Sequence, residues 1–123
     1  MSLKQSSKDS ASQRENVALS VFDCWQREAS CGCLRIEISD SEVHLFPYQH
    51  LVTASLIHAE DIETLRVTFS SHDVEIAGRN LHALLLALQD FAVKWARAMP
   101  ERYQRLEAGE NGVVSTIRIQ EVK

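Results

Sequence analysis

The chain has 123 residues, of which 45% are hydrophobic and 24% charged, and its formal net charge is −4. This length suits one globular domain, and the composition is ordinary for a globular protein. The net negative charge argues against broad nucleic-acid binding, which needs a basic surface, and no apolar run approaches the roughly 18 residues that a membrane-spanning helix requires.

The N-terminus has no apolar signal-peptide core, so we expect a cytoplasmic location. The three cysteines are an odd number, which favours reduced thiols over a disulfide framework. Residues 1–14 are polar and lack periodicity, which predicts a disordered tail. Residues 15–123 are predicted to form a single domain.

The segment from residue 16 to residue 28 fits two structures. Val17, Val21 and Trp25 would share one face of a helix, whereas Val17, Leu19 and Val21 alternate as in a strand. We favour a short helix here, and the strand remains the alternative.

Alternation of apolar and polar residues predicts strands along most of the chain. The turn-forming residues 70–73 lie between two such segments, which predicts a hairpin. Pro47 cannot donate a hydrogen bond to a sheet and therefore marks an edge, a bulge or a bend. The predicted strands are residues 34–38, 43–46, 48–58, 65–69, 74–76 and 113–122.

A stripe of apolar residues predicts one long amphipathic helix over residues 81–99. Asn80 suits the N-cap, Asp90 and Lys94 are spaced as a favourable pair on the polar side, and Pro100 would end the helix. A second short helix is expected over residues 101–108. The stripe consists of Leu81, Leu84, Leu85, Leu88, Ala92, Trp95 and Met99.

These elements together predict an α+β fold. We expect a bent, mainly antiparallel sheet of four to six strands, packed against the helix of residues 81–99, with a final strand after the helix.

Charge is unevenly distributed along the chain. Residues 37–75 contain eight acidic residues and one basic residue, Arg66, whereas residues 79–105 contain five basic residues against Asp90 and Glu101. Two solvated faces would explain this pattern. The functional alternative is a surface that associates with itself or with a charged partner.

Two motifs suggest chemistry only weakly. Cys31 and Cys33, with Cys24 upstream, are spaced too tightly for a typical zinc or redox motif and have no second pair. Residues 71–73 contain Ser, His and Asp, but adjacent residues cannot converge as a hydrolase triad does. We therefore predict no metal, no cofactor and no catalytic residue.

His44, Tyr48 and His50 surround the irregularity at Pro47 and are candidate ligand-binding residues. Histidine and tyrosine can bind a polar ligand or transfer protons, and they are also common on the solvent face of strands. If they bind a ligand, we expect a cleft between the sheet and the helix near residues 44–58.

Leu86 and Val93 lie two turns apart on the predicted helix, away from its buried stripe. Single exposed apolar side chains are common, but this pair next to Arg97 could form a contact with a subunit or partner.

The sequence therefore favours a small non-enzymatic protein-protein interaction module that associates with itself, as a homo-oligomer, or with another protein. Neither nucleic acid nor a membrane is expected as a partner. The alternative is a small-ligand-binding protein or minor enzyme that uses the cleft near residues 44–58.

Overall fold

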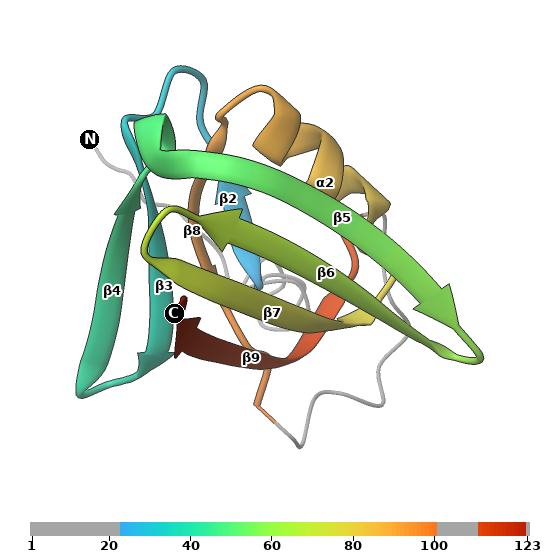
Figure 1. The fold of residues 1–123 in the computed structure, drawn as a ribbon. Coiled ribbons are helices and arrows are strands. Elements are labelled where there is room, and N and C mark those ends of the chain that lie inside the picture. The colour runs from blue at the N-terminus through green and yellow to red at the C-terminus, as the bar shows by residue number, and fades with distance from the viewer. Residues whose placement is uncertain (1–22, 101–110, 123) are drawn as a thin grey trace, which may run out of the picture.

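The computed structural model describes residues 23–100 and 111–122, which are mostly β-structure. Two four-stranded sheets enclose the core, and one short helix lies beside them (Figure 1). The predicted disordered tail, the first part of the segment 16–28 and the predicted helix 101–108 lie outside the described residues. Within the described part of the chain, no helix has the length and apolar content needed to cross a bilayer.

The first sheet has the strand order β2-β8-β3-β4. β2 pairs antiparallel with β8, and β4 pairs antiparallel with β3, whereas β3 and β8 are parallel, with Arg35 opposite Trp95. A parallel pair needs a long crossover connection, and here this connection contains three strands of the second sheet and the helix. The strands are β2 (Trp25–Arg27), β3 (Cys33–Ser39), β4 (Glu42–Pro47) and β8 (Val93–Arg97).

The second sheet is antiparallel throughout, in the order β5-β6-β7-β9. β4 ends at Pro47, and the short 3-10 helix η1 (Tyr48–His50) leads into this sheet, which confirms the bend predicted at Pro47. The predicted hairpin around residues 70–73 is confirmed as β6 and β7. The strands are β5 (Leu51–Ala59), β6 (Ile62–Phe69), β7 (His72–Arg79) and β9 (Val113–Glu121).

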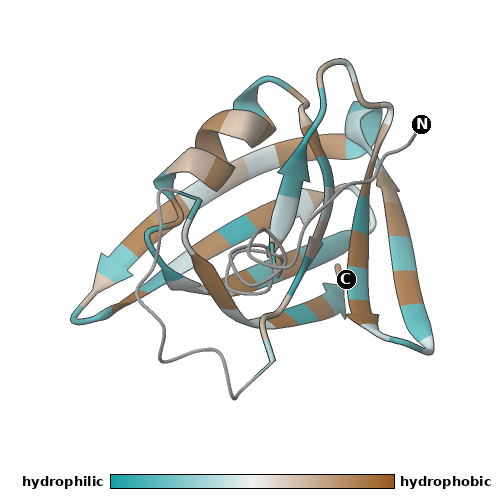
Figure 2. Ribbon diagram, turned by 180° about the vertical axis from the view of Figure 1, so that it is seen from behind, coloured by the Kyte–Doolittle hydropathy of each residue, from teal (hydrophilic) through white to brown (hydrophobic). Residues whose placement is uncertain are grey.

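The core lies between the two sheets. Apolar and polar residues alternate along the long strands, so that each strand buries one face (Figure 2). Phe46 of the first sheet stacks on Phe69 of the second, with 4.8 Å between ring centroids. The helix closes one side of the core with Leu84, Ala87 and Leu88.

The predicted helix of residues 81–99 is wrong, and with it the predicted fold class. The observed helix, α2 (His82–Gln89), has eight residues, and it does not lie along a single sheet but contacts both β5 and β8. It ends in a Schellman motif, in which the Ala92 N–H donates to the Ala87 carbonyl (2.8 Å) and the Phe91 N–H donates to the Leu88 carbonyl (3.0 Å). The chain then forms β8, because pairing on both sides with β2 and β3 outweighs the helical periodicity.

The polar contacts predicted for the long helix change accordingly. Asp90 pairs with Arg27 at 2.8 Å and Lys94 pairs with Glu28 at 3.3 Å, so the predicted pair between Asp90 and Lys94 is replaced by links to the β2 region. Leu81, not Asn80, occupies the N-cap position.

The favoured helix over residues 16–28 is also wrong where the structure describes that segment, because Trp25–Arg27 forms β2. β2 pairs with β8, and the buried Trp25 donates its indole N–H to the Asn111 carbonyl at 2.8 Å. The strand alternative is therefore correct for these three residues.

Candidate functional site

The three residues expected around a ligand cleft do not converge. His44 lies on β4, where its Nε2 is 2.8 Å from a Glu42 carboxylate oxygen, and His50 is exposed at the end of η1. Tyr48 is buried, and its hydroxyl donates to the Val93 carbonyl (2.7 Å) and accepts from the Val93 N–H (3.1 Å). Burial raises the pKa of Tyr48, so its hydroxyl stays protonated and joins η1 to β8.

The three residues expected at a partner contact also lie apart. Leu86 is 45% exposed on α2, whereas Val93 is fully buried on β8. Arg97 lies over the Trp95 ring, with 4.8 Å from its guanidinium carbon to the ring centroid. The placement of Leu86 and Val93 on one helix face is wrong because α2 ends at Gln89.

Leu86 instead lines an apolar groove between β5 and α2. The groove has a volume of about 480 Å³. Three large apolar side chains in it are exposed, namely Val52 (66%), Leu86 (45%) and Phe91 (48%). The lining residues are Leu51, Val52, Thr53, Ala54, Leu85, Leu86, Leu88, Gln89 and Phe91.

One wall of the groove is the outer edge of β5. Successive residues of a strand point to opposite faces, yet four consecutive residues, 51–54, line this groove. The groove must therefore follow the edge of the strand. The β5–β6 register shifts between Leu51 and Thr53, which makes Val52 the extra residue of a β-bulge and explains its high exposure.

Phe91 lines the groove and has an unfavourable backbone conformation. Its φ is 54°, in the left-handed region that glycine or asparagine usually occupies at the end of a helix. Its ring is close to that of Tyr48, with 5.3 Å between centroids, and remains half exposed. Strained residues of this kind cluster at functional sites, so the conformation of Phe91 favours the groove as such a site.

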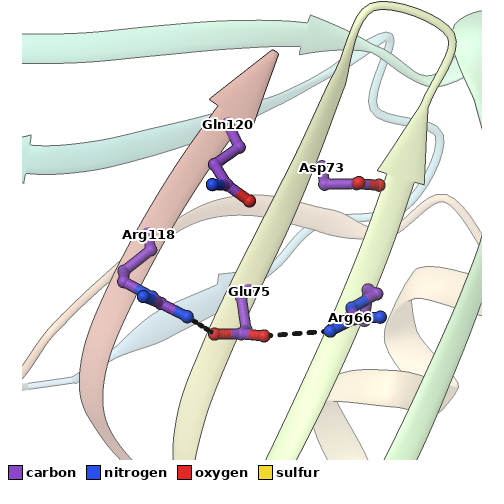
Figure 3. A pocket seen from close by; sticks show the side chains of 5 residues that line it. All are labelled: Arg66, Asp73, Glu75, Arg118 and Gln120. Carbon is purple, nitrogen blue, oxygen red and sulfur yellow. Dashed lines mark hydrogen bonds and ion pairs between the residues drawn. The ribbon is translucent and has the colours of Figure 1, made fainter. Parts of the chain in front are cut away.

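A second, polar pocket lies on the outer face of the second sheet (Figure 3). Glu75 lies opposite Arg66 on β6 and opposite Arg118 on β9, and it forms ion pairs with both. Hydrogen bonds from Arg118 and Arg66 lower the pKa of Glu75. The pocket has a volume of about 170 Å³ and is lined by Arg66, Asp73, Glu75, Arg118 and Gln120.

This polar pocket has the properties of a cross-strand network that supports the sheet. Its two arginines are balanced by two carboxylates, and Arg118 is largely exposed. Arginine partners also interrupt the acidic residues of the segment 37–75, because Glu75 pairs with Arg66 and, on the first sheet, Glu37 pairs with Arg35.

The three cysteines form no disulfide. Cys24 is buried and accepts a hydrogen bond from the Val114 N–H, and burial raises the pKa of its thiol. Cys31 donates its thiol hydrogen to the Glu28 carbonyl at 2.9 Å. In residues 23–100 and 111–122, no group of three His, Cys, Asp or Glu side chains is placed to hold a metal ion.

Residues 71–73 are not arranged as a catalytic triad. The Nδ1 atom of His72 is 2.7 Å from the Ser71 hydroxyl, but the Asp73 carboxylate accepts the Thr68 hydroxyl hydrogen instead. Asp73 therefore does not orient the imidazole of His72, as the third member of a triad would.

No protein-family model matches this chain, and neither a curated protein nor a solved structure shows significant similarity to it. The candidate site therefore rests on geometry. Of the candidate ligand-binding and interface residues predicted from sequence, the groove contains Leu86 alone, and it overlaps the cleft expected near residues 44–58 at residues 51–54. Val52 and Phe91 carry no sequence signal, because a bulge and a left-handed helix end depend on tertiary pairing.

Proposed function

We propose that this protein is a non-enzymatic interaction module that binds a second copy of itself through the groove between β5 and α2. The observation that supports this most directly is Phe91, which keeps a strained backbone while its ring stays half exposed in the groove. An aromatic side chain at a groove is a typical anchor of protein interfaces.

The chemistry of the groove supports binding rather than catalysis. Its lining residues include no titratable side chain that could act as an acid, a base or a nucleophile. Val52, Leu86 and Phe91 lie around the same groove, and a contiguous apolar patch of this kind is typical of a protein-binding surface.

We also propose that the protein works in the cytoplasm. The three cysteines, at positions 24, 31 and 33, are all unpaired, which suits a reducing compartment.

Size-exclusion chromatography with light scattering at tens of micromolar protein tests the self-association. We expect a mass above that of one chain for the wild type. Leu86→Glu should give a monomer, because it places a charge in the apolar groove, and thermal unfolding should show that the variant remains folded. Leu45→Glu is the matched control, since Leu45 is an exposed leucine on β4 outside the groove.

Two results would contradict the proposal. A strictly monomeric wild type would exclude self-association at these concentrations. A Leu86→Glu variant that keeps the wild-type mass would place the contact elsewhere.

The size of the groove favours a second candidate function, the binding of a small apolar ligand. Its volume of about 480 Å³ lies within the range of roughly 300–1,000 Å³ typical of ligand pockets. This candidate predicts a monomer that enhances the fluorescence of an apolar dye such as ANS, and it predicts that Leu86→Glu removes the enhancement. A monomer with no dye binding would exclude it.

A further inference from the structure

We propose that two copies associate by joining their β5 strands antiparallel, around a two-fold axis near Ser55, which would merge the two four-stranded sheets into one. This inference rests on the proposed self-association and specifies how it occurs. The groove beside α2 is then the place where the end of each β5 meets the partner.

The first argument is the free edge of β5. In the described part of the chain, β5 pairs only with β6. Every second residue of an antiparallel edge strand points its N–H and C=O away from the sheet. β5 has nine residues and is among the longest strands described, so its edge presents a long row of such groups.

The second argument is that β5 lacks the residues that usually block an edge. Its sequence contains no Lys, Arg, Asp, Glu or Pro, and its one titratable residue, His58, lies 3.3 Å from Glu63 of the neighbouring strand. The other edge strands of the two sheets carry charges or proline. These residues are Arg27 on β2, Glu42 and Pro47 on β4, and Arg118 and Glu121 on β9. Charged and proline residues hinder pairing at an edge strand, so among the four edge strands of residues 23–100 and 111–122, β5 is the one without such residues.

The third argument is the space beside β5. The groove separates α2 from the strand at residues 51–54. Figures 1 and 2 show that β5 then continues past the end of α2 toward the turn into β6. In pairing centred on Ser55, residues 55–59 of each copy face residues 51–55 of the other. One half of each β5 therefore pairs beyond α2, and the other half pairs beside the groove, where the space between β5 and α2 receives the end of the partner strand.

The fourth argument is that β5 is compatible with itself. In antiparallel pairing centred on Ser55, Ser55 lies opposite its own copy, and the exposed Ile57 lies opposite the exposed Thr53. Glu60, just beyond the strand, meets His50, which can donate a hydrogen bond to its carboxylate. No like charges face each other along the paired strands.

Charge substitution at Ser55 tests the two-fold axis directly. Ser55 is exposed and lies on the outer face of the sheet, opposite Arg66. Ser55→Lys alone and Ser55→Asp alone should each weaken the dimer about tenfold or more, because each places like charges opposite each other at the axis. An equimolar mixture of the two variants should recover dimer, because unlike charges then meet.

Thr116 provides the matched control. It is exposed on β9, the other edge of the same sheet, so Thr116→Lys and Thr116→Asp should leave the dimer constant unchanged. Sedimentation equilibrium of each variant and of the mixture measures the dimer constant, and thermal unfolding shows that each variant is folded.

The outcomes separate this inference from the proposed function. If the wild type is monomeric, self-association itself is wrong. If the wild type is dimeric and Leu86→Glu dissociates it, but the Ser55 variants associate as the wild type does, the groove is the interface and strand pairing is wrong. If the single variants dissociate but their mixture does not recover dimer, Ser55 does not face its own copy and the two-fold pairing is overturned.

Discussion

Replacing Phe91 with glycine or alanine separates two effects of this residue. Its backbone has a φ of 54°, and its half-exposed ring lines the groove. Phe91→Ala removes the ring but keeps the backbone strain, because alanine still has a Cβ atom. Phe91→Gly removes the same ring and also removes the backbone strain.

The difference between the two variants isolates the backbone effect. A left-handed backbone costs a residue with a Cβ atom about 1–2 kcal/mol. Relative to alanine, glycine also lowers the free energy of unfolding by about 0.4–1 kcal/mol, because it makes the unfolded protein more flexible. Phe91→Gly should therefore have a free energy of unfolding about 1 kcal/mol higher than Phe91→Ala. For a domain of this size, that difference raises the melting temperature by roughly 4 °C.

Chemical and thermal unfolding measure the stability, and sedimentation equilibrium measures the association. Both variants should associate at least about fivefold more weakly than the wild type, because the loss of an aromatic anchor typically costs more than about 1 kcal/mol. If Phe91→Gly is no more stable than Phe91→Ala, Phe91 is not held in the left-handed conformation. If neither variant weakens association, the ring is not part of the interface.

Three further substitutions test the structure around the groove and the sheets. Tyr48→Phe leaves the buried N–H and C=O of Val93 without the hydroxyl and should cost about 1–3 kcal/mol in urea unfolding; an unchanged stability would contradict these bonds. Gly112→Ala should lower the melting temperature strongly, because Gly112 has a φ of 78° and the added Cβ would lie 2.2 Å from the Asn80 carbonyl oxygen. The folded-state pKa of Glu75 is lowered, so its contribution to stability is present above its ordinary pKa of 4.5 and is lost as the pH falls through the lower, folded value. The wild type should therefore lose more stability than Glu75→Gln on acidification below 4.5, and equal losses would contradict the ion pairs.

Much of the local structure could be predicted from the sequence. Residues 34–38 and 65–69 alternate with period two and form strands, and the turn at residues 70–73 joins a hairpin as expected. Leu81, Leu84 and Leu88 are buried as their helical spacing predicts. These predictions succeed because periodicity and turn chemistry depend only on near neighbours in the chain.

The site could be predicted only in part. Leu86 lies off the buried stripe of the helix, and it is exposed. The sequence predicts Val93 on an exposed helix face and Tyr48 at a ligand cleft. Instead, β8 and η1 bury both residues, and two hydrogen bonds join the Tyr48 hydroxyl to the Val93 backbone. Phe91 carries no signal in the sequence, because a helix of residues 81–99 would include it.

The sequence by itself determined where strands can form and which residues of the first helical turns face the core. Only the tertiary structure decided that the helix ends at Gln89 and that residues 93–97 form a strand. Val93 and Ala96 are buried in β8 whereas Trp95 is half-buried, so burial along this strand does not alternate and the local pattern does not predict a strand. The choice comes from pairing with β3 and β2, which lie about 60 and about 70 residues earlier in the chain, and the same choice exposes Phe91 beside β5.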